Sequence, residues 1–228
     1  MVKKDHGLRT SEPNMDHPRK KAYIWTTWLT GLLAGTDKCM WRSWFKAHFR
    51  YTKREGDGGF DLAEWTKQHD VMTNARAKKL EAQGWTVRLE DDNSFKLDGA
   101  MSTLSGKPDL LALKEEDKLA RVIDEKSGKP RDSDMWQVLI YMFALPLLWA
   151  KGWRIDGEVE YRHGSLEVPA EQLTLDVTNK IVAKIRAVGG DDEPPRTPSP
   201  QECRFCDILN CPDRWTGRPN VADASDYF

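Results

Sequence analysis

Asp109, Asp124 and Lys126 have residue types and a spacing that suit chemistry on a phosphodiester. Asp109 ends the segment Gly106-Lys107-Pro108-Asp109, and Asp124-Glu125-Lys126 begins fifteen residues later. If Leu119–Lys126 is a strand, successive side chains alternate between its faces. Asp124 and Lys126 then share one face and Glu125 points to the other, while the neighbouring strand of the hairpin presents Asp109.

Two carboxylates and a lysine on one sheet face are the components of metal-assisted phosphodiester hydrolysis. Mg²⁺ and Mn²⁺ take one or two protein carboxylates together with water and phosphate oxygens. The lysine can orient or help to deprotonate the attacking water and offset the charge on the phosphorane. Taken alone, the same residues also fit a surface Asp–Lys pair on a strand edge. The choice between a catalytic site and a surface ion pair therefore depends on the neighbouring residues.

Three further side chains favour the chemical interpretation. Gln137 and Tyr141 are four residues apart on an expected helix and therefore share a face just beyond the carboxylates. An amide and a phenol at that place would position a nucleic-acid backbone or the lysine. His69 lies on another expected helix, where a neutral imidazole could complete the shell of a metal. A single histidine on a helix is more often structural, but its order relative to the other residues favours a functional role.

The four cysteines form the second pattern. Cys39 stands alone, whereas Cys203, Cys206 and Cys211 form a C-x2-C-x4-C motif near the C-terminus. Disulfides are not expected in a reducing compartment. Four thiolates suit tetrahedral zinc and suit an iron–sulfur cluster equally well, and the spacing alone does not separate the two.

Composition restricts the class of protein. The chain has 228 residues, of which 39% are apolar and 16 are glycine, so a sizeable core is expected and a collagen, a coiled coil or a wholly disordered chain is excluded. The longest uncharged apolar run, Val138 to Ala150, is shorter than the roughly 20 residues that span a bilayer. With no secretory signal visible, we expect a cytoplasmic protein without membrane contact. No G-x4-G-K-[ST] loop is present, so no ATP binding is expected.

The formal net charge of −1 conceals an uneven distribution. Residues 1–54 contain twelve Lys and Arg against four Asp and Glu. This basic third indicates a local contact with a polyanion, or else a solvated tail. Tryptophans in the same region fit stacking on unpaired bases or a helical core face; they are Trp25, Trp28, Trp41 and Trp44.

Hydrophobic periodicity predicts a mixed α/β domain with a cysteine segment behind a linker. The expected helices cover about 23–35, 37–51, 62–82, 135–150 (capped by Ser133 or Asp134 and bent by Pro146) and 175–188. The expected strands are 85–89, 95–97, 108–113, 119–126, 158–162 and 165–168. The predicted units are a mobile basic tail (1–21), a catalytic domain with an N-terminal helical part (22–188), a Pro-rich linker (189–200) and the cysteine segment (201–228).

The order of these motifs resembles a known family. The series His69, Pro108-Asp109, Asp124-Glu125-Lys126 and Gln137-x3-Tyr141 is similar to the RecB-type branch of the PD-(D/E)XK nuclease superfamily. Cysteines on both sides of that series resemble its iron–sulfur subgroup, which includes CRISPR-associated exonucleases of spacer acquisition. The similarity covers roughly residues 23–215. Relatives often have proline after the first cysteine, where this chain has Met40.

The resemblance implies a restriction-endonuclease-like core, a mixed central sheet flanked by helices. It makes His69, Asp109 and Asp124 ligands of Mg²⁺ or Mn²⁺, with the Glu125 carbonyl as a further ligand. Asp124 is preferred to Glu125 because a Glu125-based motif would need lysine at position 127, which is serine. The implied roles of the others are catalysis for Lys126, substrate positioning for Gln137 and Tyr141, and ligation of a [4Fe–4S] cluster for Cys39, Cys203, Cys206 and Cys211.

The expected function is metal-dependent hydrolysis of DNA, as an exonuclease or endonuclease acting on single strands or ends. The cluster would pin the N-terminal helices to the C-terminal segment as a structural staple. A helicase or a CRISPR-adaptation protein is the expected kind of partner. The alternative is a non-catalytic nucleic-acid-binding protein with a structural four-cysteine zinc site, although such a protein has no reason to keep two acids facing a polyanion.

Overall fold

The structure is a computed structural model that describes residues 16–54 and 61–217. Its helices are α1 (Thr27–Ala34), α2 (Met40–His48), α3 (Leu62–Ala82), α4 (Asp132–Leu148), α5 (Leu175–Gly189) and α6 (Pro200–Arg204), with 3-10 helices η1 (Glu90–Asn93) and η2 (Ala170–Gln172). Its strands are β1 (His17–Pro18), β2 (Ala22–Trp25), β3 (Phe49–Arg50), β4 (Thr86–Leu89), β5 (Phe95–Asp98), β6 (Ser102–Gly106), β7 (Leu110–Lys114), β8 (Leu119–Lys126), β9 (Arg154–Tyr161) and β10 (Gly164–Val168).

A five-stranded mixed sheet forms the centre of the molecule, in the order β10-β9-β8-β7-β4. β8 and β9 are parallel, and the other neighbouring pairs are antiparallel. A smaller sheet has the order β2-β6-β5, and β1 pairs with β3. The structure therefore confirms the predicted mixed α/β architecture and the predicted hairpin of β7 and β8.

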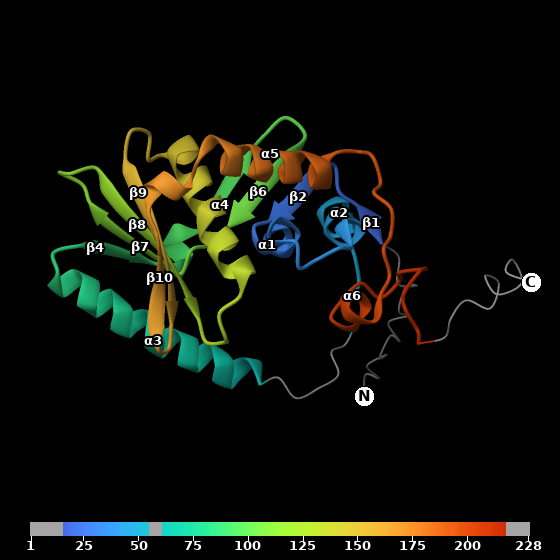
Figure 1. Ribbon diagram of the computed structural model, residues 1–228, viewed down its shortest axis with the longest axis horizontal. Coiled ribbons are helices and arrows are strands. Elements are labelled where there is room, and N and C mark those ends of the chain that lie inside the picture. The colour runs from blue at the N-terminus through green and yellow to red at the C-terminus, as the bar shows by residue number, and fades with distance from the viewer. Residues whose placement is uncertain (1–15, 55–60, 218–228) are drawn as a thin grey trace, which may run out of the picture.

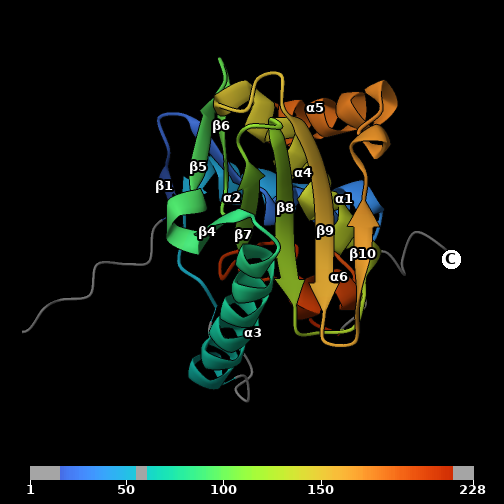
Figure 2. The ribbon, with the colours of Figure 1, turned by 90° about the vertical axis from the view of Figure 1, so that its left-hand side faces the viewer.

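Helices cover both faces of the central sheet. Figure 2 shows α3 on the near side of the sheet and α4 behind the strands, and α3 contacts β4, β7 and β8. Because both faces are covered, β7 is a nearly continuous apolar run, and residues 122–125 of β8 are buried on both faces. Leu110 and Ile123 pack under α3 against Leu80, whereas Leu111 and Val122 belong to the larger core on the α4 side.

Helix α3 has the predicted bounds, and local chemistry explains both of its ends. The Asp61 carboxylate accepts the Glu64 N–H at 3.0 Å and caps the first turn. At the other end, Gly84 takes a left-handed conformation (φ +81°), which glycine adopts without a Cβ penalty. Helix α3 is therefore a well-defined support for His69.

The N-terminal segment differs from the prediction, because Ala22–Trp25 is a strand and the helix begins only at Thr27. β2 pairs in parallel with β6, a strand that the sequence did not predict. Ile24 is fully buried by this pairing. Tyr, Ile and Trp favour strands when a partner edge is available, and that edge lies some eighty residues away in the sequence.

Two helix starts also differ from the prediction. The second helix is shorter than the expected range 37–51, which placed Cys39 inside it, and Cys39 is its N-cap residue. At the start of α4 the N-cap is Arg131, not Ser133 or Asp134. Asp134 lies one turn inside the helix, and its carboxylate accepts the Arg131 N–H at 2.9 Å. The backbone N–H of the N-cap residue thus has a hydrogen-bond partner.

The structure also describes the end of the predicted basic tail and the predicted linker. Residues 1–15 of the predicted basic tail are outside the described residues, but β1 at its end pairs with β3. The predicted linker 189–200 is held by the Trp44 indole, which donates to the Gly190 carbonyl at 2.8 Å, and by Trp41, which donates to Glu193 at 2.7 Å. α6 lies close to α2 in Figure 1. In the described part of the chain, no helix combines the length and apolarity needed to cross a bilayer.

Candidate active site

The β7–β8 hairpin brings the two predicted aspartates to one end of the central sheet. Leu110 pairs with Ile123 across the hairpin, so Asp109 precedes β7 beside the end of β8. The Asp109 carboxylate accepts the backbone N–H of Glu125 at 2.6 Å. Its position is therefore fixed by the backbone of the strand that carries Asp124.

Asp124 and Lys126 form a buried pair on the α4 side of β8. Lys126 Nζ lies 2.5 Å from Asp124 Oδ2. The Gln137 amide connects the two residues: its Nε2 donates to Asp124 Oδ1 at 2.7 Å, and its Oε1 accepts from Lys126 Nζ at 3.1 Å. The structure thus brings together three of the predicted site residues, through contacts between β8 and α4.

Tyr141 lies one helical turn beyond Gln137 and does not line the cleft. Its hydroxyl accepts from Gln137 Nε2 at 2.9 Å and donates to the Lys107 carbonyl at 3.2 Å. Burial raises the pKa of Tyr141 well above its ordinary value, so the hydroxyl remains a neutral donor. Tyr141 can therefore act only through Gln137, as a positioning residue.

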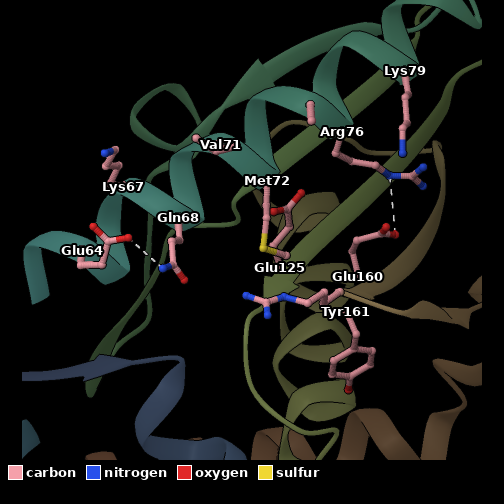
Figure 3. A pocket seen from close by; sticks show the side chains of 12 residues that line it. Glu64, Lys67, Gln68, Val71, Met72, Arg76, Lys79, Glu125, Glu160 and Tyr161 are labelled. Carbon is pink, nitrogen blue, oxygen red and sulfur yellow. Dashed lines mark hydrogen bonds and ion pairs between the residues drawn. The ribbon is translucent and has the colours of Figure 1, made fainter. Parts of the chain in front are cut away.

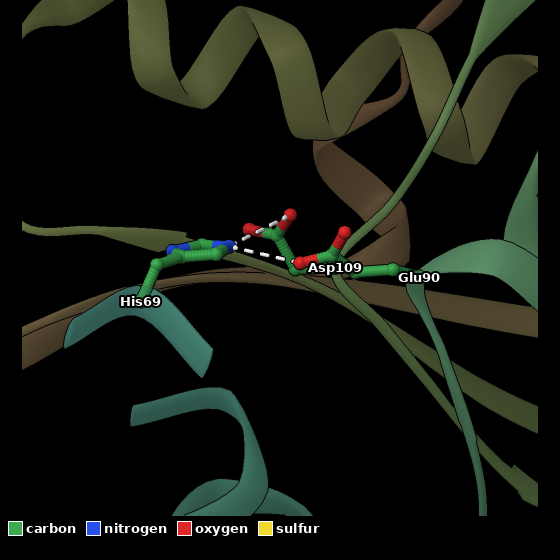
Figure 4. A group of neighbouring side chains, drawn as sticks. All are labelled: His69, Glu90 and Asp109. Atoms are coloured by element: carbon green, nitrogen blue, oxygen red, sulfur yellow. Dashed lines mark ion pairs between the residues drawn. The ribbon is translucent and has the colours of Figure 1, made fainter. Parts of the chain in front are cut away.

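His69 meets Asp109 from the opposite side. Its Nε2 lies 3.4 Å from Asp109 Oδ1 and 3.4 Å from Glu90 Oε1, and Figure 4 shows both carboxylates turned toward the imidazole. One ligand atom from each of these three residues lies within 4.8 Å of the others. Nitrogen and oxygen donors at such separations can hold a divalent cation.

Glu90 is a site residue that the sequence did not predict. It begins η1 directly after β4, and its N–H donates to the Asp109 carbonyl at 3.0 Å. Its other carboxylate oxygen accepts from Lys107 Nζ at 2.6 Å. The only signal in the sequence was an acid at the end of an expected strand. The antiparallel pairing of β4 with β7, which places that acid beside Asp109, is a long-range feature.

Trp65 forms a wall of the site that the sequence also did not predict. Its ring stacks on His69 with centroids 5.1 Å apart and an interplanar angle of 8°. Its indole N–H donates to the Ser127 hydroxyl at 3.0 Å, which ties α3 to the loop that follows β8. Trp65 is 38% exposed, so part of its ring remains available at the mouth of the site.

A cleft of about 500 Å³ opens beside these groups, and Trp65 is one of the residues that line it. Of the predicted site residues, those that line it are His69, Asp109, Asp124, Glu125, Lys126 and Gln137. The loop after β8 contributes Lys129 and Arg131 to its rim. An acidic floor beside cationic groups is the arrangement that binds a metal ion together with a phosphate.

Burial and neighbouring charges shift the pKa values in the cleft. Burial raises the pKa of Asp124 to about 7, against the opposing effect of Lys126. Burial alone would lower the pKa of Lys126, but the attraction of Asp124 outweighs it, so the net shift is upward. The hydrogen bond with Asp109 raises the pKa of His69. The acids of the cleft therefore favour the binding of a positive charge.

Glu125 points to the other side of β8, as strand alternation predicts, and lies beneath α3. One of its oxygens accepts from the Thr73 hydroxyl at 3.3 Å, and Oε1 has no hydrogen-bond partner among the described residues. Burial raises the pKa of Glu125 to about 7. Figure 3 shows its side chain behind Met72, in a hollow of about 390 Å³ between α3 and β9.

The four cysteines converge although 163 residues separate Cys39 from Cys203. All four are free thiols and line one small cavity beside Arg42 and Arg196. The backbone N–H of Trp215 donates to Cys203 Sγ at 3.2 Å. Aromatic side chains of α2 pack around Cys206. All four therefore border the same cavity, and a shared metal centre stays a prediction from the sequence.

A mixed sheet with acids and a lysine at the end of one hairpin is the arrangement expected of a phosphodiester hydrolase. The family comparison agrees: the model of the PD-(D/E)XK nuclease superfamily matches residues 32–211, more than three-quarters of the chain. The chain belongs to this superfamily, and its membership implies nuclease activity on nucleic acids. The RecB-type branch and the iron–sulfur subgroup remain predictions from the sequence.

Comparison with individual proteins adds little. No relative was found among curated proteins. The chain is similar to a solved structure titled "Crystal structure of SSO0001", with 13% identity, a TM-score of 0.46, and coverage of 88% of this chain and 90% of that chain. At this level the likeness does not bear on function.

Proposed function

We propose that this protein is a metal-dependent deoxyribonuclease that hydrolyses phosphodiesters in single-stranded DNA or at DNA ends. The observation that carries the proposal is the position of the His69–Glu90–Asp109 group beside the Asp124–Lys126 pair, at a cleft that both groups line in part. The preference for DNA and for single strands or ends rests on the sequence resemblance. Exonuclease and endonuclease action are both compatible with the cleft.

The donor set fits Mg²⁺ or Mn²⁺. Both ions prefer carboxylate oxygens, and Mn²⁺ also accepts imidazole nitrogen. Asp109, Asp124, His69 and Glu90 would hold the ion, and the Glu125 carbonyl is a further predicted ligand. When bound, the ion polarises the phosphate and lowers the pKa of a coordinated water.

The residues of the chain supply orientation and positive charge. The Lys126 ammonium is held by Asp124 and Gln137, yet it lines the cleft and is partly accessible. From there it can donate to a phosphate oxygen or hold the attacking water. Tyr141 fixes the Gln137 amide and thereby limits the movement of the ammonium. Preorganised charge of this kind is a large part of catalytic power in water-poor sites.

The four cysteines are proposed to bind a [4Fe–4S] cluster as a structural staple between α2 and the C-terminal segment. Four thiols around one cavity and an N–H···S hydrogen bond support a thiolate-ligated centre. A structural zinc site is the alternative with the same ligands. Iron, acid-labile sulfide and zinc measured on anaerobically purified protein distinguish the two.

Cleavage of labelled single-stranded DNA with Mn²⁺, with Mg²⁺ and with EDTA tests the proposed activity. We expect cleavage with either metal, none with EDTA, and none by Asp109→Asn. Binding without cleavage under all conditions would instead support a non-catalytic nucleic-acid-binding protein. A helicase or CRISPR-adaptation partner stays a prediction from the resemblance.

A further inference from the structure

A second hollow, of about 820 Å³, opens beside the catalytic cleft. It lies between the loop 127–131, which follows β8, and the turn 162–163, which joins β9 to β10. Ser127, Gly128, Lys129 and Arg131 line both the hollow and the cleft. The two hollows therefore share this loop as a common wall, and we call the second one the side groove.

The parallel pairing of β8 with β9 explains why the groove is next to the catalytic residues. Lys126 pairs with Tyr161, so both strands end at the same level. Figure 2 shows the loop after β8 and the β9–β10 turn side by side at this end of the sheet. In open α/β sheets, ligands bind at the carboxyl ends of the strands.

The charges of the side groove are basic and unpaired. Lys129, Arg131, Arg162 and His163 are exposed, and among the described residues no acid lies within ion-pair distance of these side chains. In the part of the chain that the structure describes, Asp132 is the only acid that lines the groove. By contrast, Arg76 of α3 and Arg121 of β8 are both paired with Glu158. Uncompensated cations in one groove attract a polyanion.

The floor of the groove is apolar. Met135, Tyr161 and Leu166 line it, and Leu166 is 40% exposed. Cations along a rim and an aromatic ring on the floor suit a single strand, whose unpaired bases can stack while its phosphates meet the cations. A duplex keeps its bases stacked inside and offers phosphates only, so an apolar floor adds nothing to its binding.

We propose that the side groove binds the single-stranded nucleic acid on one side of the scissile phosphate. Lys129 and Arg131, which belong to both hollows, meet the phosphates next to the cleavage site, and Arg162 and His163 meet phosphates farther along. This inference rests on the proposed nuclease function and specifies its substrate as a single strand that extends beyond the cleft.

Arg162→Glu in the full chain tests the inference, with Lys151→Glu as the matched control. Lys151 is an exposed cation just before β9, at the opposite end of that strand. Binding of labelled oligo-dT of increasing length is measured by anisotropy in EDTA over a range of salt, and cleavage of the same strands is measured in Mn²⁺. We expect Arg162→Glu to raise the Kd and KM of long strands about tenfold and to make the salt slope shallower by about 0.7 for each phosphate that is no longer neutralised.

The outcomes distinguish a failure of the groove inference from a failure of the proposed nuclease function. If Arg162→Glu and Lys151→Glu match the wild type in Kd, KM and salt slope at every length, the groove inference is overturned while cleavage stands. If binding depends on Arg162 but no strand is cleaved in Mn²⁺, the groove stands and the proposed nuclease function fails. If a duplex binds more tightly than a single strand and depends on Arg162, the single-strand assignment is overturned.

Discussion

His69 Nε2 and Asp109 Oδ1 lie 3.4 Å apart, although forty residues separate the two in the sequence. His69 comes from α3, and Asp109 precedes the strand β7 that α3 covers. The contact between His69 and Asp109 lies on one side of the cleft, and the Asp124–Lys126 pair lies on the other. Because different residues lie on the two sides, substitutions can test each side separately.

Asp124→Asn is expected to abolish cleavage in Mn²⁺, whereas Glu125→Gln is expected to retain most of it. The Asp124 carboxylate faces the cleft and holds Lys126, but the Glu125 carboxylate lies beneath α3. Both variants are assayed on the same labelled strand under identical conditions. An inactive Glu125→Gln together with an active Asp124→Asn would show that the assignment of the two strand faces is wrong.

Glu90→Gln is expected to weaken Mn²⁺ binding and cleavage about 10–100-fold, the range found when groups that support a metal site are removed. The amide keeps the shape of the side chain but loses the charge beside His69 and Asp109. Calorimetric titration with Mn²⁺ gives the affinity. Glu116→Gln, in the exposed turn between β7 and β8, is the control. Equal Mn²⁺ affinity in Glu90→Gln and wild type would remove Glu90 from the ligand set.

The metal-free protein is expected to lose stability as the pH rises from about 4.5 to 7. Burial raises the folded-state pKa of Glu125 to about 7, above its unfolded value of about 4.3. Its contribution is therefore fully present below the unfolded pKa and is lost as the pH rises through the folded pKa. Thermal unfolding in EDTA should show a smaller fall in Tm for Glu125→Gln than for wild type, with about 2–4 °C for each kcal/mol.

Cys39→Ala is expected to lose the bound metal and expose the segment 189–200 to protease. This cysteine joins α2 to a segment that begins more than 160 residues later in the chain. Metal content and limited proteolysis are measured on the same preparations. Trp44→Phe, which removes the hydrogen bond to Gly190 but no thiol, should loosen the segment and keep the metal. Full metal content in Cys39→Ala would contradict a shared four-cysteine site.

Local regularities in the sequence were sufficient for several elements. Alternation placed Asp124 and Lys126 on one face of β8, and the bounds of α3 followed from its apolar spacing. Strand alternation and helical spacing repeat every few residues, so they follow from the local backbone geometry and can be read from the sequence. The shared face of Gln137 and Tyr141 on α4 also follows from local helical spacing.

Long-range pairing decided what the sequence left open. Ala22–Trp25 is a strand only because β6 offers an edge to it, and Glu90 joins His69 only because β4 pairs with β7. Such contacts depend on which distant surfaces pack together, and that choice is made by the burial of whole elements and not by the preference of one segment. The sequence by itself determined the acids, the lysine and the four cysteines, and the tertiary structure added Glu90 and Trp65 and the groove beside them.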